Sequence, residues 1–175
     1  MSKLAPSSAA LPLAHAALRL LIILNWLGGA AILALLVVLP NEQWIMSALE
    51  LSPSPEADRS VMGLRAIAVV SFAAVPLNHV ILRRLLAIVG TVREGDPFVT
   101  TNATRLQAIA WALLALQLLS LVIAAIAGYV STPAHPLDLD AGVSINGWLA
   151  VLLTFLLARV FAEGTRIRDD LDGVV

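Results

Sequence analysis

The chain has 175 residues, of which 59% are hydrophobic and only 13% are charged, and its net charge is −1. Soluble domains carry about 25% charged residues, so this composition excludes an ordinary water-soluble domain and indicates a protein whose solvent is lipid. The absence of cysteine excludes disulfides, thiolate metal sites and cysteine nucleophiles.

Four apolar stretches without a charged residue follow one another, at residues 20–39, 66–82, 106–130 and 141–158. An α-helix rises about 1.5 Å per residue, so about 20 apolar residues cross the roughly 30 Å hydrocarbon layer of a bilayer. We therefore predict an all-α fold, a polytopic membrane four-helix bundle formed by a single domain. The expected spans are residues 16–39, 62–86, 104–130 and 141–160, with short helical extensions of spans two and four and a cytoplasmic tail at 161–175.

Positive charges are concentrated in alternate segments between these stretches. The connection after the first stretch and the connection after the third carry mainly Asp and Glu, with Arg59 and Arg65 as the exceptions. The positive-inside rule therefore predicts that both termini are cytoplasmic. The nine Lys and Arg residues expected on that side are Lys3, Arg19, Arg83, Arg84, Arg93, Arg105, Arg159, Arg166 and Arg168.

Polar residues within the spans are the natural places to look for a ligand site, because hydrocarbon penalises them. Pro76 opens the helical hydrogen-bond ladder, and Asn78 and His79 follow it directly. Together with Asn25 of the first span, these residues form a candidate ligand pocket. Asn25 and Asn78 also share an expected depth with Trp111 and Thr154, and the alternative interpretation of this polar layer is hydrogen bonding between helices.

Cofactor sites have weaker support in the sequence. His15 and His79 would lie at similar depth, as two haem ligands do, but an interfacial histidine and a hydrogen-bonded core histidine explain them better. His135, Asp138 and Asp140 suit a divalent cation, although a solvated loop is the simpler interpretation. We predict no catalytic constellation, no metal site and no cofactor, and hence no enzyme.

Small residues at four-residue spacing predict where helices approach closely. They are Ala30 and Ala34, Ala124 and Gly128, and the series Ala150, Thr154 and Ala158.

The connection between the second and third spans carries the clearest structural signals. Apolar residues continue past Arg83 and Arg84 at helical spacing, so the second helix should extend beyond the span. Gly95-Asp96-Pro97 should end it, because the residue before proline avoids helical dihedral angles. Thr100, Thr101 and Asn102 are the candidate N-caps of the third helix.

In the C-terminal segment from Val160 to Leu171, apolar residues recur near helical spacing and charged residues lie between them. Such an amphipathic helix is typical of a segment that docks on a cytoplasmic partner. The alternative is that the last helix runs into water with its own cytosolic loop as its partner.

The same connection contains the sequence Val92-Arg93-Glu94-Gly95-Asp96-Pro97-Phe98, followed by Asn102, Arg105-Leu106 and Ile109. This pattern resembles the hallmark of a bacterial four-span membrane family, domain of unknown function 2975, and residues 160–170 resemble that family's ending. The resemblance implies no established activity. Members are often encoded beside a small helix-turn-helix regulator, which suggests a membrane-bound controller of a soluble transcription factor.

We therefore expect a non-enzymatic regulatory protein of the bacterial inner membrane that contacts the lipid bilayer and a cytoplasmic helix-turn-helix regulator. Direct binding of nucleic acid is not expected, and self-association stays open. The alternative is a bundle that binds or transports a small molecule or lipid near the kinked second span. The residues expected to bind the partner are Arg93, Glu94, Asp96, Phe98, Arg105, Glu163, Arg166 and Arg168.

Overall fold

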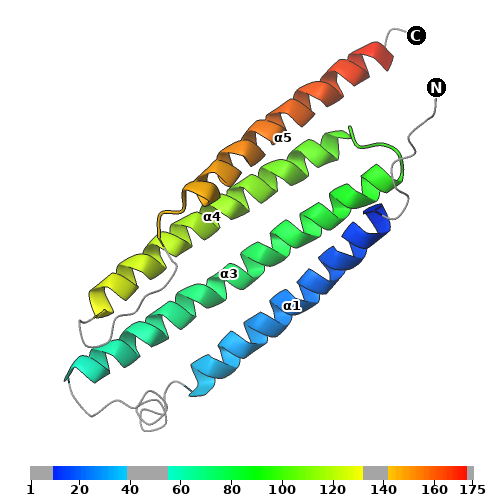
Figure 1. Ribbon diagram of the computed structural model, residues 1–175. Helices are drawn as coiled ribbons and strands as arrows, with labels where there is room; N and C mark the ends of the chain where they lie inside the picture. The colour runs from blue at the N-terminus through cyan, green and yellow to red at the C-terminus, as the bar shows by residue number, and fades with distance from the viewer. Residues whose placement is uncertain (1–9, 39–54, 132–141, 173–175) are drawn as a thin grey trace.

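The computed structural model describes residues 10–38, 55–131 and 142–172. These residues form four α-helices, named α1 (Ala10–Val38), α3 (Pro55–Arg93), α4 (Thr100–Val130) and α5 (Ile145–Asp172) (Figure 1). No strand occurs in this described part of the chain. The predicted all-α fold with four long apolar helices is confirmed.

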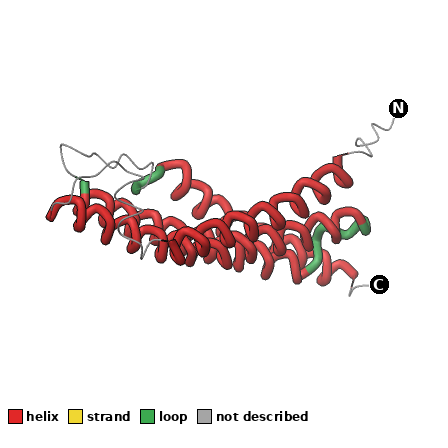
Figure 2. Tube along the Cα trace, turned by 90° about the horizontal axis from the view of Figure 1, so that it is seen from below, coloured by secondary structure: helices red, strands yellow, loops and turns green. Residues whose placement is uncertain are grey.

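The helices lie side by side in chain order, each antiparallel to the next. Helix α1 packs on α3, α3 packs on α4, and α4 packs on α5, and no other pair of these four helices is in contact. Figure 2 shows that the result is a thin layer, so the bundle is open and has two broad faces. The start of α1, the end of α5 and the α3–α4 connection lie at one end of this layer (Figure 1), which we call the loop end, and the opposite end is the far end.

All four helices are long and apolar enough to cross a membrane. Large apolar side chains are exposed on every one of them, for example Leu24, Val69, Leu118 and Leu152. Exposing so much apolar surface to water is unfavourable, whereas lipid tails are as apolar as leucine. The chain is therefore a multi-pass membrane protein whose two broad faces suit contact with lipid.

Helix α3 continues well past the arginines at positions 83 and 84, as the apolar pattern predicted, and it runs without interruption through Pro76. Its 39 residues give a rod of about 58 Å, roughly twice the thickness of the hydrocarbon layer. At least one end of α3 must therefore extend out of the lipid.

Helix α5 begins at Ile145, later than the position 141 predicted for the start of the fourth span. The Oγ of Ser144 accepts a hydrogen bond from the backbone N–H of Gly147 at 3.1 Å, which is the geometry of a helix N-cap. Gly142 has a φ of +127°, which a right-handed helix does not allow. The cap and this glycine together fix the later start.

Each helix interface contains one glycine at which the neighbouring helix comes very close. A Cβ built on Gly29 would lie 2.8 Å from Val75, one on Gly63 would lie 2.3 Å from Val130, and one on Gly147 would lie 2.4 Å from Gln117. Missing side chains of this kind let membrane helices approach closely. These three contacts join α1 to α3, α3 to α4, and α4 to α5.

The small residues at four-residue spacing were predicted to lie where helices pack closely, and most of them do not. Ala30, Ala34 and Ala150 are exposed, and a Cβ on Gly128 would meet nothing within 4 Å. Ala158 of α5 is the exception, because it is buried against Leu106 and Ile109 of α4. A four-residue spacing marks one face of a helix, but the position of the neighbouring helix decides which face makes contact.

Replacing Gly63 by alanine should destabilise the protein, because the new methyl group would overlap Val130, whose β-branched side chain cannot move aside easily. We expect Gly63→Ala to lower the free energy of unfolding by about 1–3 kcal/mol, as overpacking does. Unfolding in mixed detergent micelles, followed by circular dichroism, measures the change.

Gly90→Ala is the matched control on the same helix, since a Cβ there meets nothing within 4 Å. It should leave the stability unchanged or raise it by up to about 1 kcal/mol through helix propensity. Equal stability of the two variants would contradict the close α3–α4 contact.

Candidate functional site

The α3–α4 connection at the loop end is folded into a defined turn. The backbone N–H of Gly95 donates to the carbonyl of Val92 at 3.2 Å, and the N–H of Asp96 donates to the carbonyl of Thr91 at 3.1 Å. This pair of bonds, with Gly95 at a φ of +88°, is a Schellman motif. The predicted stop at Gly95-Asp96-Pro97 is confirmed, because α3 ends at Arg93.

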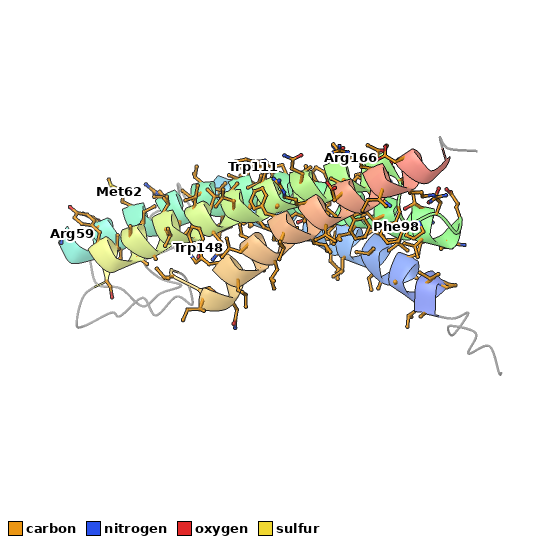
Figure 3. All side chains as sticks on the ribbon, turned by 90° about the horizontal axis from the view of Figure 1, so that it is seen from above. Arg59, Met62, Phe98, Trp111, Trp148 and Arg166 are labelled. Carbon is orange, nitrogen blue, oxygen red and sulfur yellow. The ribbon has the colours of Figure 1, made fainter. Side chains whose placement is uncertain are left out.

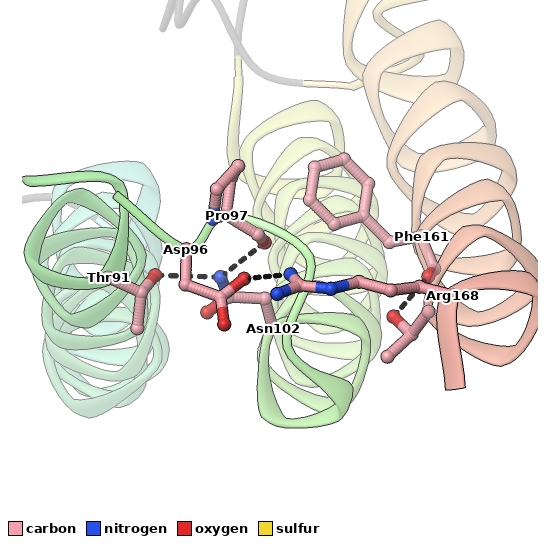
Figure 4. A network of polar contacts seen from close by, with 7 residues as sticks. Thr91, Asp96, Pro97, Asn102, Phe161 and Arg168 are labelled. Carbon is pink, nitrogen blue, oxygen red and sulfur yellow. Dashed lines mark hydrogen bonds and ion pairs between the residues drawn. The ribbon is translucent and has the colours of Figure 1, made fainter. Parts of the chain in front are cut away.

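Asn102 is the centre of this turn. Its side chain is fully buried, with 0% of its surface exposed. The Nδ2 group donates to the Thr91 hydroxyl at 2.7 Å and to the Pro97 carbonyl at 2.9 Å, and Oδ1 accepts from Arg105 Nη1 at 2.8 Å. Figure 4 shows how this one amide ties α3, the connection and α4 together.

Two neighbours extend the network of Asn102. The Thr91 hydroxyl donates to the carbonyl of Ile88 at 2.8 Å, so it acts as acceptor and donor at once. Arg105 Nη1 also approaches the carbonyl of Ala87 on α3, at 3.4 Å. Arg105, predicted to bind a partner, is thus already engaged within the chain.

The predicted N-caps of α4 are wrong. The N-cap residue is Val99, and no side chain forms a capping hydrogen bond there. Thr100 and Thr101 are exposed, and the Asn102 side chain turns toward Thr91 and Pro97 instead. The buried amide gains more partners across the turn than it would gain from one backbone N–H at the helix end.

The end of α5 packs against the same turn. The rings of Phe98 and Phe161 are stacked with centroids 5.3 Å apart, and Gly164 lies beside the Phe98 ring, where a Cβ would make an ordinary contact at 3.6 Å. Arg168 Nη1 forms an ion pair with Asp96 Oδ1 (Figure 4). We call Asp96, Phe98, Phe161, Gly164 and Arg168 the clasp.

The two contacts of the clasp differ in strength. The Asp96 and Arg168 side chains are each about half exposed, and such surface ion pairs contribute about 0–1 kcal/mol. An aromatic pair contributes about 0.5–1.5 kcal/mol in addition to the stabilisation from the apolar area that it buries. The two phenylalanines therefore contribute more to the stability of the clasp than the ion pair does. The contact predicted as the alternative for the tail, a helix packed on its own loop, is therefore present.

A buried apolar cluster supports the clasp from within the layer. Leu106 and Ile109 of α4 and Ala158 of α5 are buried together, with Leu85 of α3 and Phe161 of α5 packed against them. The loop end therefore joins three helices, whereas elsewhere the layer is held by neighbouring pairs.

Six of the eight predicted partner-binding residues are exposed at this end. Phe98 and Arg168 belong to the clasp, and the four that lie outside it are Arg93, Glu94, Glu163 and Arg166. Figure 3 shows Arg166 on the surface of α5, away from Phe98. Between α1 and α3, an open groove of about 420 Å³ is lined by His15, Gly90, Arg93 and Glu94. The structure thus places the charged side chains of Arg93 and Glu94 beside a groove at the loop end.

Of the four residues of the predicted ligand pocket, Pro76 lines a groove, whereas Asn25 and His79 form hydrogen bonds between helices. Asn25 Nδ2 donates to the carbonyl of Val75 at 3.1 Å, and Trp26 Nε1 donates to His79 Nδ1 at 3.1 Å, so Asn25 and His79 join α1 to α3. Pro76 lines a shallow groove against α4 whose other lining residues are all apolar, and Asn25, Asn78 and His79 do not line it.

The rest of the predicted polar layer does not link helices through hydrogen bonds. The Thr154 hydroxyl donates to Ala150 of its own helix at 2.7 Å. The Trp111 ring packs edge-on against Phe155, with centroids 5.2 Å apart. Asn25 of the predicted polar layer therefore forms a hydrogen bond between α1 and α3, while Trp111 makes an aromatic contact between α4 and α5.

The structure also bears on the weaker cofactor interpretations. His15 lies beside Gly90, which is eleven residues, or about 16 Å, along α3 from His79, so the two histidines do not face each other. Within the described ranges, no group of three His, Asp or Glu side chains is placed to hold a metal ion. His135, Asp138 and Asp140 lie outside the described residues.

Comparison with known proteins gave one result. A family model described as Protein of unknown function (DUF2975) matches residues 37–175, which is more than half of the chain. The match agrees with the resemblance predicted from the motif in the α3–α4 connection. No match was found among curated proteins or solved structures.

Asn102 offers the sharpest test of how the turn is held. Asn102→Ala should lower the free energy of unfolding by about 1–3 kcal/mol, because the Thr91 hydroxyl, the Pro97 carbonyl and the Arg105 guanidinium each lose a hydrogen-bond partner. Asn102→Asp should also destabilise, since it keeps the acceptor for Arg105 but turns a second oxygen toward the Pro97 carbonyl. Unfolding in detergent micelles measures both effects.

Thr101→Ala, at the exposed neighbouring position, is the control and should change the stability by no more than about 0.5 kcal/mol. If Asn102→Ala were as stable as this control, the network would contribute nothing to holding the turn.

Proposed function

The chain belongs to the DUF2975 family, and we propose that it is a non-enzymatic regulatory protein of the bacterial inner membrane. Its loop end faces the cytoplasm and binds a soluble protein there, of which a small helix-turn-helix regulator is the leading candidate. Binding would hold such a regulator at the membrane and so change its access to DNA. The exposed charges on a rigid helical platform are the observation that carries this proposal.

The distribution of charge supports the orientation. The arginines at the loop end include Arg83, Arg84, Arg93 and Arg166, all of them exposed, whereas Arg59 and Arg65 lie toward the far end of α3. Positively charged segments are retained on the cytoplasmic side during insertion. This bias favours an arrangement in which both termini are cytoplasmic.

The geometry of the loop end supports docking of a protein. Arg93 and Glu94 lie at the end of α3, and Glu163 and Arg166 are three residues apart on α5, which places them on one face of that helix. The clasp and Asn102 hold these two helix ends together. A partner with complementary charges would therefore meet a preformed surface and lose little conformational entropy from this side on binding.

The orientation is testable directly, because the natural chain contains no cysteine. Single variants Glu163→Cys at the loop end and Val143→Cys at the far end both place a thiol at an exposed position. A maleimide that cannot cross the inner membrane should label Val143→Cys in cells with a permeable outer membrane. Glu163→Cys should react only after the inner membrane is opened, and the reverse pattern would overturn the orientation.

The docking surface is testable with charge variants in detergent or nanodiscs. The double variant Arg93→Glu, Arg166→Glu should weaken binding of a purified helix-turn-helix regulator encoded beside the protein by at least about ten-fold. The physical reason is that like charges brought together across an interface cost more than about 1.4 kcal/mol. Biolayer interferometry measures the dissociation constant.

Arg59→Glu is the control, since it makes one of the same charge reversals at the far end, half the change of charge in the double variant. Equal binding by the wild type, the double variant and this control would rule out the assigned surface. No binding by the wild type would rule out this partner.

A further inference from the structure

A second groove at the loop end lies between α4 and α5. It encloses about 500 Å³, and its walls carry two kinds of side chain. Thr100, Thr104 and Gln107 of α4 and Arg159 of α5 supply polar groups, while Phe155 and Ala162 are among the apolar lining residues. The groove is separate from the charged hollow between α1 and α3.

The polar groups of this groove suit an anion. Arg159 is exposed, and no carboxylate in the described part of the chain forms an ion pair with it. No acidic residue lines the groove, and Glu163, one turn along α5 from Arg159, lies outside it. An arginine binds phosphate oxygens through two parallel hydrogen bonds, and threonine hydroxyls donate readily to the same oxygens.

The groove also crosses the edge of the apolar part of the layer. The apolar stretch of α5 ends just before Arg159, and that of α4 begins just after Arg105, so Phe155 and Gln107 lie deeper than Thr100 and Ala162. A phospholipid has its phosphate at this boundary and its acyl chains below it. Phe155, packed against Trp111, offers an apolar surface at the depth of the acyl chain.

We propose that the α4–α5 groove binds one anionic phospholipid, with its phosphate on Arg159 and Thr104 and an acyl chain along Phe155. The positive end of the α4 helix dipole adds a smaller attraction at the same place. The lipid would fill the groove between α4 and α5. It would therefore stabilise the packing of α5 against α4, independently of any protein partner.

Native mass spectrometry of the purified protein, titrated with phosphatidylglycerol or with zwitterionic phosphatidylcholine, tests the proposal. The wild type should retain phosphatidylglycerol preferentially. Arg159→Gln should weaken that binding about five-fold and leave phosphatidylcholine unaffected, as expected for the loss of one charge near an anionic headgroup. Ala162→Trp should abolish the preference by filling the groove.

Arg84→Gln is the matched control, because Arg84 is also an exposed arginine at the loop end but lies on α3, outside the groove. It should bind phosphatidylglycerol like the wild type. Equal losses in Arg84→Gln and Arg159→Gln would mean general attraction to the charged end and would overturn the proposal.

Two further outcomes would also overturn it. One is equal retention of the two lipids by the wild type. The other is displacement of phosphatidylglycerol by inorganic phosphate, which would assign the groove to a free anion. Because neither readout involves a soluble partner, failure here is distinguishable from failure of the docking proposal.

Discussion

The buried amide of Asn102 is the interaction on which the loop end depends. Helices α3 and α4 are the middle pair of the layer, so the outer helices keep their places only if this pair is fixed. Asn102 satisfies both its donors and its acceptor across the turn, and a fully satisfied buried amide is both strong and geometrically specific. The clasp then adds α5 to the fixed pair.

The rest of the layer follows from having lipid as its solvent. A water-soluble four-helix protein must close around one core, because each helix has to hide its apolar face. Here large apolar side chains are exposed on all four helices, so the helices need to contact only their neighbours in the row. Close approach at Gly29, Gly63 and Gly147 provides the packing that hydrophobic burial cannot provide between helices in a membrane.

The loop end combines the features that a binding surface requires. Its backbone is held by the Schellman turn, its side chains by Asn102 and the two stacked phenylalanines, and its remaining charges face outward. Of the residues proposed to bind a partner, Asp96, Phe98, Arg105 and Arg168 build the platform. Arg93, Glu94, Glu163 and Arg166 are left to make contact. Under the proposed function, the first four residues have a structural role and the last four a binding role.

The sequence alone determined the number of helices, their approximate spans and the end of α3. These depend on local rules: the length of an apolar stretch sets a membrane span, and Gly95-Asp96-Pro97 ends a helix whatever lies nearby. The family was also recognisable, because its motif is contiguous in the chain.

Only the tertiary structure decided which helix faces meet, and hence the roles of individual polar residues. Asn102 was expected to cap α4 and instead cross-links the turn, because Thr91 and Pro97 come within reach only once α3 and α4 have packed. Gly128 was predicted to contact another helix, but a Cβ built there would meet nothing within 4 Å, whereas Gly63 lies against Val130. Spacing along one helix carries no information about the position of the next helix. The grooves at the loop end likewise exist only between helices, so they left no pattern in the sequence.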